Sequence, residues 1–301
     1  RRAAAAGTGR PPRPARATRR PSRVATSDLP PTAVRLRATP PGGPTVFAFA
    51  GGGTSALSLL PIAQRLPATA GVIGFHASGY TDRAVPDWSL RRVVDRHLEV
   101  LRAQQRHGPY LLIGHSYGGL LALETARRLA DAGESVPAVV LLDTNLPPAL
   151  VARGRQAVGS EVPEPTPEPA PGAAARWLMH ARLVGAGLVR YRPEVRDAVF
   201  WEQSLRLINR HTLTTWGGRT VVITVPENPD DPRWWSLVLT GEHEIVRIPG
   251  GHNSMLREPF HEPVVARITD EMVALWGVPD TLSAGRLEQT PGSGQEFPPL
   301  G

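Results

Sequence analysis

Cysteine and lysine are absent from this chain of 301 residues, and long apolar runs are absent as well. Without cysteine the chain can form neither a disulfide nor a thiolate metal site, which is consistent with a reducing, cytoplasmic setting. No apolar run reaches the roughly 18 residues of a membrane-spanning helix, and residues 1–21 lack the apolar stretch of a secretory signal. We therefore expect a protein that is not exported, with no membrane partner and no metal site.

The net charge of +7 is distributed unevenly along the chain. Residues 1–37 hold ten Arg against a single acid, Asp28, whereas residues 38–301 carry a net charge of −2. The basic segment is rich in Pro and Gly, and it lacks the interleaved aromatic residues that are typical of single-strand nucleic-acid binding. We interpret residues 1–44 as a disordered linker and residues 277–301 as a disordered tail, and we expect no nucleic-acid partner.

From Thr45 onward, apolar strands alternate with amphipathic helices. Strands are predicted at 45–50, 71–75, 110–115, 138–143, 220–225 and 245–248, and helices at 56–66, 89–106 and 118–132. Alternation of this length is typical of a parallel sheet that is covered by helices on both faces. The predicted fold class is therefore α/β with a mostly parallel central sheet, in one domain that spans residues 45–276.

The segment Gly114-His115-Ser116-Tyr117-Gly118 has the pattern G-x-S-x-G and lies between an apolar strand and an amphipathic helix. That context is typical of a nucleophile elbow, in which glycines leave room for a strained turn that exposes the serine. We predict that Ser116 is a nucleophile. The amide of Tyr117, at the start of the helix, is then placed to stabilise an oxyanion. We assign His115 to packing.

A serine nucleophile requires a base, and nine histidines are candidates. His252 directly follows an apolar strand and lies in a Gly-rich loop near the end of the fold, so we predict that it is the base. His243 is the second candidate, although its position before the same strand favours a surface location. His97 and His107 belong to a helix and its end, and we assign them structural roles.

Two places in the sequence offer an acid that could orient the base. Asp143 ends the predicted strand 138–143, and catalytic groups collect at the carboxyl ends of parallel strands. Alternatively, Glu227, Asp230 or Asp231 could serve from the loop after the strand 220–225. The later loop also fits a simple solvated connection. We favour Asp143, because it ends an apolar strand and is followed by the turn TNLPP, residues 144–148.

Three stretches resemble the thioesterase domains that terminate nonribosomal peptide synthetases and related polyketide assembly lines, members of the α/β-hydrolase superfamily. Residues 114–148 (GHSYGGLLALETARRLADAGESVPAVVLLDTNLPP) carry the nucleophile and the acid, residues 250–256 (GGHNSML) are similar to the histidine loop, and residues 46–66 are similar to the first strand and helix. The resemblance covers residues 44–276. It implies an acid after the strand that follows the nucleophile helix, which supports Asp143 and separates this chain from stand-alone editing thioesterases.

The resemblance also implies roles for the oxyanion hole and the insertion. It places the second oxyanion-hole amide at Gly52, where a glycine allows close backbone approach to an acyl oxygen. Residues 145–215 contain a proline-rich stretch, 159–172, and two helix-like segments, 173–189 and 193–213, which predict a helical lid that meets the carrier domain. Six lid residues are candidates for an acyl pocket, although packing against the body would suit each of them equally: Trp177, Met179, Leu183, Phe200, Trp201 and Leu205.

What the resemblance implies is a serine thioesterase. It would release an acyl or peptidyl chain from the phosphopantetheine of a carrier protein through an acyl-O-serine intermediate, by hydrolysis or macrocyclisation. The carrier would lie upstream in the same polypeptide, and the enzyme would bind no cofactor of its own. We expect a monomer, because no amphipathic helix precedes Thr45. A free-standing esterase or lipase of the same fold, or a stand-alone editing thioesterase, is the alternative.

Overall fold

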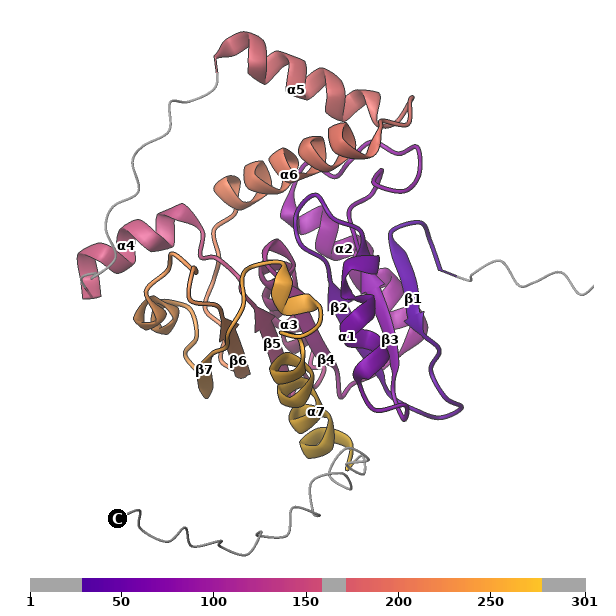
Figure 1. Cartoon of the computed structure of the whole chain (residues 1–301), viewed down its shortest axis with the longest axis vertical. Helices are drawn as coiled ribbons and strands as arrows, with labels where there is room; N and C mark the ends of the chain where they lie inside the picture. Colours follow the sequence, from indigo (N-terminus) through magenta and orange to yellow (C-terminus); the bar gives the residue numbers. More distant parts are fainter. Residues whose placement is uncertain (1–28, 159–171, 278–301) are drawn as a thin grey trace, which may run out of the picture.

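A seven-stranded sheet forms the centre of the computed structural model, which describes residues 29–158 and 172–277 (Figure 1). The strand order is β1-β3-β2-β4-β5-β6-β7. Strand β1 pairs antiparallel with β3, and the other pairings are parallel. The strands are β1 (Ala33–Arg37), β2 (Thr45–Phe49), β3 (Gly71–Phe75), β4 (Leu111–His115), β5 (Ala138–Leu142), β6 (Arg219–Thr224) and β7 (His243–Arg247). The predicted mostly parallel α/β architecture is confirmed.

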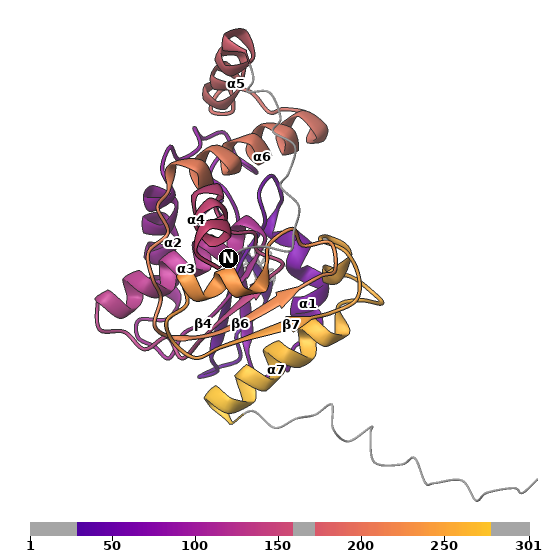
Figure 2. The same cartoon turned by 90° about the vertical axis from the view of Figure 1, so that its left-hand side faces the viewer.

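Helices cover both faces of this sheet (Figure 2). The α-helices are α1 (Leu60–Arg65), α2 (Leu90–Gln104), α3 (Tyr117–Asp131), α4 (Pro148–Val158), α5 (Ala173–Gly185), α6 (Pro193–Arg210) and α7 (Glu262–Trp276), and the 3-10 helices are η1 (Ala56–Leu59), η2 (Pro232–Leu237) and η3 (Ser254–Leu256). Successive residues of β2 alternate between two cores: Phe47 and Phe49 pack with α2 and α3, whereas Val46 and Ala48 pack with α1 and α7. Such two-sided burial explains why the central strands are continuous apolar runs.

Strand β1 corrects the predicted domain boundary at Thr45. The residues assigned to a linker, 1–44, include this strand, which adds to the sheet beside β3 and buries Ala33 and Leu36. Arg37 donates hydrogen bonds to the carbonyls of Gln64 and Pro67, at 2.6 and 2.8 Å, so its guanidinium group stabilises the folded domain. Residues 1–28 and 278–301, where the rest of the linker and the tail were predicted, lie outside the described residues.

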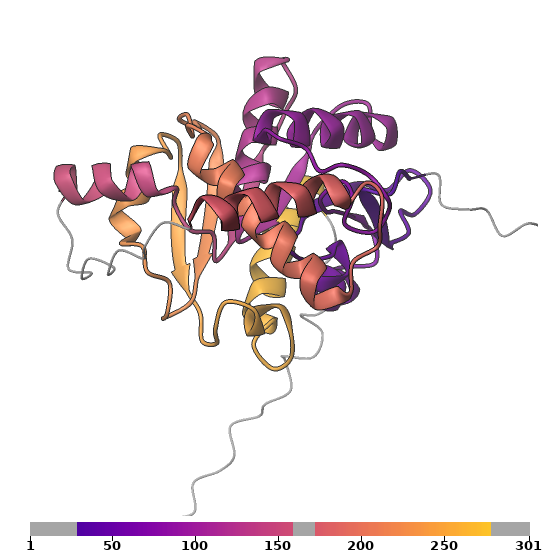
Figure 3. The same cartoon turned by 90° about the horizontal axis from the view of Figure 1, so that it is seen from above.

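The insertion between β5 and β6 contains α4, α5 and α6, of which only the last two were predicted. Figures 1 and 3 show α6 crossing above the sheet, with α5 lying farther from it. Helix α4 packs beside η2, where Gly154 approaches the Trp234 ring so closely that a Cβ would lie 2.5 Å from it. The proline-rich stretch is outside the described residues, except for Gly172. No helix within 29–158 or 172–277 has the length and apolar character to cross a bilayer.

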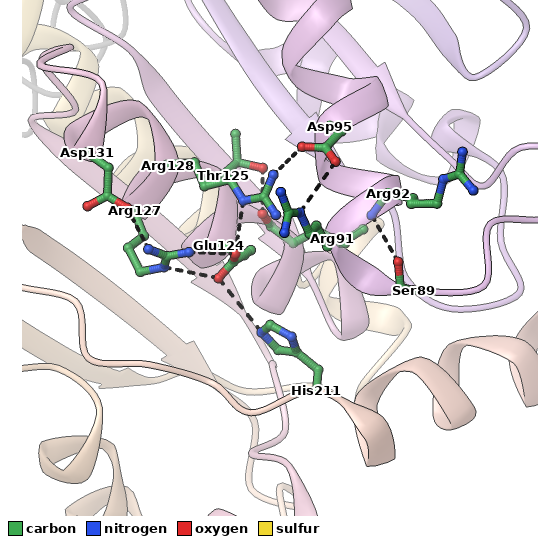
Figure 4. Close-up of polar contacts among 11 residues, drawn as sticks. Ser89, Arg91, Arg92, Asp95, Glu124, Thr125, Arg127, Arg128, Asp131 and His211 are labelled. Carbon is green, nitrogen blue, oxygen red and sulfur yellow. Dashed lines mark hydrogen bonds and ion pairs between the residues drawn. The ribbon is translucent and has the colours of Figure 1, made fainter.

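The chain leaves the lid at His211, next to an ionic cluster on α3 (Figure 4). The buried carboxylate of Glu124 accepts hydrogen bonds from Arg127 at 2.8 Å and from Arg128 at 3.1 Å, and His211 lies 3.8 Å from it. Burial disfavours the charged form of Glu124, but these hydrogen bonds outweigh it and lower its pKa. His211, which follows α6, thus lies beside this cluster on α3, the helix that begins at Tyr117.

Candidate active site

The turn between β4 and α3 holds Ser116 in a strained conformation. Its φ and ψ are 54° and −124°, and among the non-glycine residues that the structure describes only Ser116 and Asp143 have a positive φ. The flanking glycines have no room for a side chain: a Cβ at Gly114 would lie 2.2 Å from the carbonyl oxygen of Gly118. Strain of this kind persists where the surrounding structure imposes it, and it clusters at functional sites.

The acid and base candidates are in direct contact. Nδ1 of His252 lies 2.6 Å from Oδ2 of Asp143, whose side chain is 2% exposed. The other oxygen of Asp143 accepts hydrogen bonds from Nδ2 of Asn228 at 2.7 Å and from the amide of Val225 at 3.2 Å. Burial raises the pKa of Asp143, but the hydrogen bonds from His252, Asn228 and Val225 outweigh it, so the net shift is downward. An ionised carboxylate on Nδ1 leaves Nε2 of His252 available to accept a proton.

The side chains of the predicted triad line one cavity under α6. Ser116, Asp143 and His252 line a space of about 330 Å³, to which the lid contributes Trp201 and Leu205. The three come from the carboxyl ends of different parallel strands, β4, β5 and β7, because those ends meet at one edge of the sheet. The site therefore has a nucleophile candidate, an oriented imidazole and room for a substrate.

Of the predicted oxyanion-hole residues, Tyr117 is the first residue of α3, so its amide has no partner inside the helix. A Cβ at Gly51 would lie 3.4 Å from Cβ of Ser116, which places the loop after β2 beside the nucleophile. Gly52 faces the lid, since a Cβ there would lie 2.1 Å from Oγ of Ser204. Tyr117 and Gly52 both line a small second cavity of about 30 Å³ beneath α6.

The lid residues divide by helix. On α6, Trp201 and Leu205 line the active-site cavity and Phe200 lines the second cavity. On α5, Leu183 is fully buried and Met179 packs beside it in a cluster that joins the lid to Tyr80. Trp177, whose exposed fraction is 72%, lines neither cavity, and Leu183 and Met179 pack within the lid. The reason is that α6 lies between α5 and the sheet (Figure 1).

The competing acids and histidines have other surroundings. The carboxylate of Asp230 accepts a hydrogen bond from the amide of Leu146 at 2.5 Å. The carboxylate of Asp231 caps η2 by accepting a hydrogen bond from the amide of Arg233 at 2.9 Å. Glu227 lines the active-site cavity, but the carboxylate that contacts the His252 ring is that of Asp143.

Among the remaining histidines, His243 lies inside β7 with Nδ1 on the carbonyl of Gly241 at 3.0 Å. His97 is buried against Phe49 and Phe75, in agreement with the structural role assigned to it. His107, whose side chain is 80% exposed, pairs with Glu134.

Two side chains that were not predicted to belong to the site contact the triad. Asn228 binds Asp143, as described above, and Nε2 of His115 lies 2.8 Å from the carbonyl oxygen of His252. Asn228 stands in the loop that was searched for a carboxylate, where an amide carries no signal of its own. His115 precedes the nucleophile and was assigned to packing alone.

Together, the sheet, the strained serine turn and the lid over the carboxyl edge define an α/β-hydrolase fold. Residues 44–271 match the family model of the thioesterase domain, and the chain belongs to that family. The resemblance that was predicted from the sequence is confirmed.

The curated relatives are much longer than this chain. Over 102 residues, 34% of this chain and 8% of the relative, the sequence is 36% identical to Enterobactin synthase component F of Escherichia coli (strain K12). Over 103 residues, 34% of this chain and 5% of the relative, it is 36% identical to Non-reducing polyketide synthase CTB1 of Cercospora nicotianae. Each matched segment is less than a tenth of the relative's length.

Solved structures share the fold at low sequence identity. The NocB thioesterase domain from the Nocardicin cluster has a TM-score of 0.57 at 19% identity, covering 76% of this chain and 94% of that one. The four-domain nonribosomal peptide synthetase AB3403 has a TM-score of 0.60 at 15% sequence identity, and the match covers 82% of this chain and 20% of that one. The type II thioesterase BorB from the borrelidin biosynthetic cluster has a TM-score of 0.59 at 21% sequence identity, and the match covers 80% of this chain and 97% of that one. These likenesses establish the fold, which a type II enzyme also has.

Proposed function

We propose that this thioesterase domain releases an acyl or peptidyl chain from the phosphopantetheine thioester of a carrier protein, through an acyl ester on Ser116. The observation that carries the proposal is the 2.6 Å contact between His252 and Asp143 in the cavity that Ser116 lines. Membership of the thioesterase family supports the substrate class. Similarity to segments of large synthases supports a carrier-borne substrate.

In the first half-reaction, Nε2 of His252 removes the proton of Ser116 as Oγ attacks the thioester carbonyl carbon. The amides of Tyr117 and Gly52 stabilise the oxyanion that develops on the carbonyl oxygen. Asp143 stabilises the imidazolium and remains ionised. The C–S bond then breaks, the pantetheine sulfur leaves and receives the proton from His252, and the acyl group remains on Oγ.

In the second half-reaction, His252 deprotonates a new nucleophile, which attacks the acyl carbon. Oγ of Ser116 leaves and recovers its proton from His252, so the enzyme returns to its starting state. Water as nucleophile gives a free acid, and an amine or hydroxyl of the same chain gives a macrocycle. Exclusion of water by the lid determines which nucleophile reaches the ester.

The position of the acid supports a chain-terminating domain over a stand-alone editing enzyme. Asp143 follows β5, the strand directly after the nucleophile helix, as the resemblance to terminal domains implies. The partner we propose is a carrier domain of the same polypeptide, which would reach the site at a high effective concentration. The monomeric state and the cytoplasmic location stay predictions.

The proposal is tested by comparing octanoyl and dipeptidyl N-acetylcysteamine thioesters with their oxygen-ester analogues. We expect faster turnover of the thioesters, loss of turnover in Ser116→Ala, and a loss of about 10²-fold or more in kcat for Asp143→Asn. Glu227→Gln, which removes the alternative acid, should retain most of the activity. Cleavage of the oxygen esters alone would indicate an esterase instead, and a larger loss in Glu227→Gln than in Asp143→Asn would assign the acid to the later loop.

A further inference from the structure

We propose that His115 is a positioning residue, whose Nε2–H holds the main chain of His252 and so fixes the base over Ser116. This inference rests on the proposed function, since it assigns His252 the role of base. His115 is the last residue of β4 and is 2% exposed. Its Nε2 lies 2.8 Å from the carbonyl oxygen of His252, and the centroids of the two rings are 4.8 Å apart.

The hydrogen bonds that the His252 loop makes within itself include one at Gly251, whose carbonyl accepts it from the amide of Met255 at 3.1 Å. Gly250 has a φ of 108°, and a second glycine, Gly251, directly precedes His252. The hydroxyl of Ser254 accepts a hydrogen bond from the amide of Gly251 at 2.8 Å, which restrains one side of the loop. The bond from His115 restrains the loop at the catalytic residue itself, and it links the end of the rigid strand β4 to a Gly-rich segment 137 positions away.

The hydrogen-bond chemistry fixes the tautomer of His115. A carbonyl oxygen can only accept, so Nε2 must carry the proton and donate it. Nδ1 is then unprotonated and carries a lone pair, and it has no hydrogen-bond partner in the described part of the chain. Burial lowers the pKa of His115 to about 4, so the ring is neutral near pH 7. A neutral donor orients the base without opposing the positive charge that His252 acquires during the reaction.

Two substitutions separate this role from simple packing. The amide nitrogen of glutamine can occupy the position of Nε2, so His115→Gln preserves a donor for the carbonyl of His252. The shorter amide of His115→Asn lies near the position of Nδ1 and cannot reach that carbonyl. His243→Asn is the matched control, because His243 also binds a main-chain carbonyl, through Nδ1, but lies in β7 outside the cavity.

The test uses the full chain with octanoyl-N-acetylcysteamine. For His115→Asn we expect kcat to fall about 10- to 100-fold with KM changed less than about twofold, because the substitution disturbs a general base worth about 10²–10⁴ in rate. His115→Gln should stay within about fivefold of the wild type, and His243→Asn should match it. The rate of Ser116 modification by a fluorophosphonate should follow the same order, while melting temperatures stay similar.

Equal activity of His115→Asn and the wild type would overturn the inference, as would a loss of activity that parallels a loss of thermal stability in both amide variants. If His115→Asn does not fold, nitrogen-15 NMR of histidine-labelled wild type decides: a neutral Nε2–H tautomer of His115 from about pH 5.5 to 8 supports the inference, and an Nδ1–H tautomer contradicts it. Absence of thioester turnover and of Ser116 modification in the wild type would instead overturn the proposed function, and this inference with it.

Discussion

At the scale of single residues, backbone strain coincides with the proposed chemistry. Ser116 and Asp143 have φ values of 54° and 45°, which side-chain-bearing residues rarely adopt. Both follow the last residue of a central parallel strand, where hydrogen bonds to the neighbouring strands fix the backbone: the amide of Ser116 binds Leu142, and that of Asp143 binds Ile223. The sheet thus imposes the conformations that turn the two side chains toward one cavity.

Asn228 keeps the acid ionised and in place. Asn228→Ala removes the 2.7 Å bond to Asp143, and we expect kcat/KM to fall about tenfold, as for loss of a hydrogen bond to a charged group worth about 1.5 kcal/mol. Because that bond lowers the pKa of Asp143, its loss raises the pKa, and carbon-13 NMR of aspartate-labelled protein should show the Asp143 carboxyl titrating at higher pH in Asn228→Ala than in the wild type. An unchanged titration would show that Asn228 does not tune this carboxylate.

Asp230 destabilises the fold when it ionises. Burial raises its pKa to about 6, with a smaller contribution from the charge of Asp143. In the unfolded chain the Asp230 carboxyl ionises near pH 3.8. The folded state therefore loses stability as the pH rises from about 3.8 through about 6. Asp230→Asn keeps an acceptor for the Leu146 amide, and we expect it to stabilise the protein by about 1–3 kcal/mol at pH 7–8 and by almost nothing below about pH 4. Urea unfolding at both pH values checks this, and a variant less stable at pH 8 would contradict it.

At the scale of elements, the two lid helices differ in function. Trp201 on α6 lines the active-site cavity, whereas Trp177 on α5 points to solvent. We expect Trp201→Ala to raise KM for octanoyl-N-acetylcysteamine about tenfold, as for about 1.4 kcal/mol of lost apolar contact, and Trp177→Ala to leave KM unchanged. Steady-state kinetics on the pair measure this difference. Equal effects of the two substitutions would mean that the lid adopts another arrangement over the substrate.

The sequence predicted elements well where burial alone determines them. The strand 71–75 was predicted with its observed bounds, because both faces of β3 are buried and its apolar run is continuous. Strand β1 was missed, since Arg35 and Arg37 flank Leu36 and match the composition of the preceding basic segment. Helix α4 was missed because it begins at the second of two adjacent prolines, Pro147 and Pro148, which predict a turn.

The residues of the candidate site that the sequence predicts are those marked by a local motif or by a position after a parallel strand. Ser116, Asp143 and His252 follow parallel strands, and the carboxyl ends of parallel strands share an edge. Asn228 and His115 belong to the site through contacts over 85 and 137 positions of sequence. Nothing in the local sequence distinguishes them from a loop amide and a packing histidine, so only the assembled fold reveals them.

At the scale of the whole molecule, the folded unit includes residues that composition assigned to a linker. Removing residues 1–44 deletes β1 and the buried side chains of Leu29, Ala33 and Leu36, so we expect a loss of about 3 kcal/mol or more relative to a chain that starts at residue 29. Urea unfolding of both forms measures the difference. Equal stability would return the domain boundary to Thr45.

The proposed acyl ester on Ser116 is a covalent intermediate, which intact-protein mass spectrometry can detect. After rapid mixing with octanoyl-N-acetylcysteamine, we predict a single octanoyl adduct that peptide mapping locates on Ser116. It should be absent in Ser116→Ala and form slowly in His252→Ala. An adduct on another residue, or turnover that persists in Ser116→Ala, would contradict the proposed mechanism.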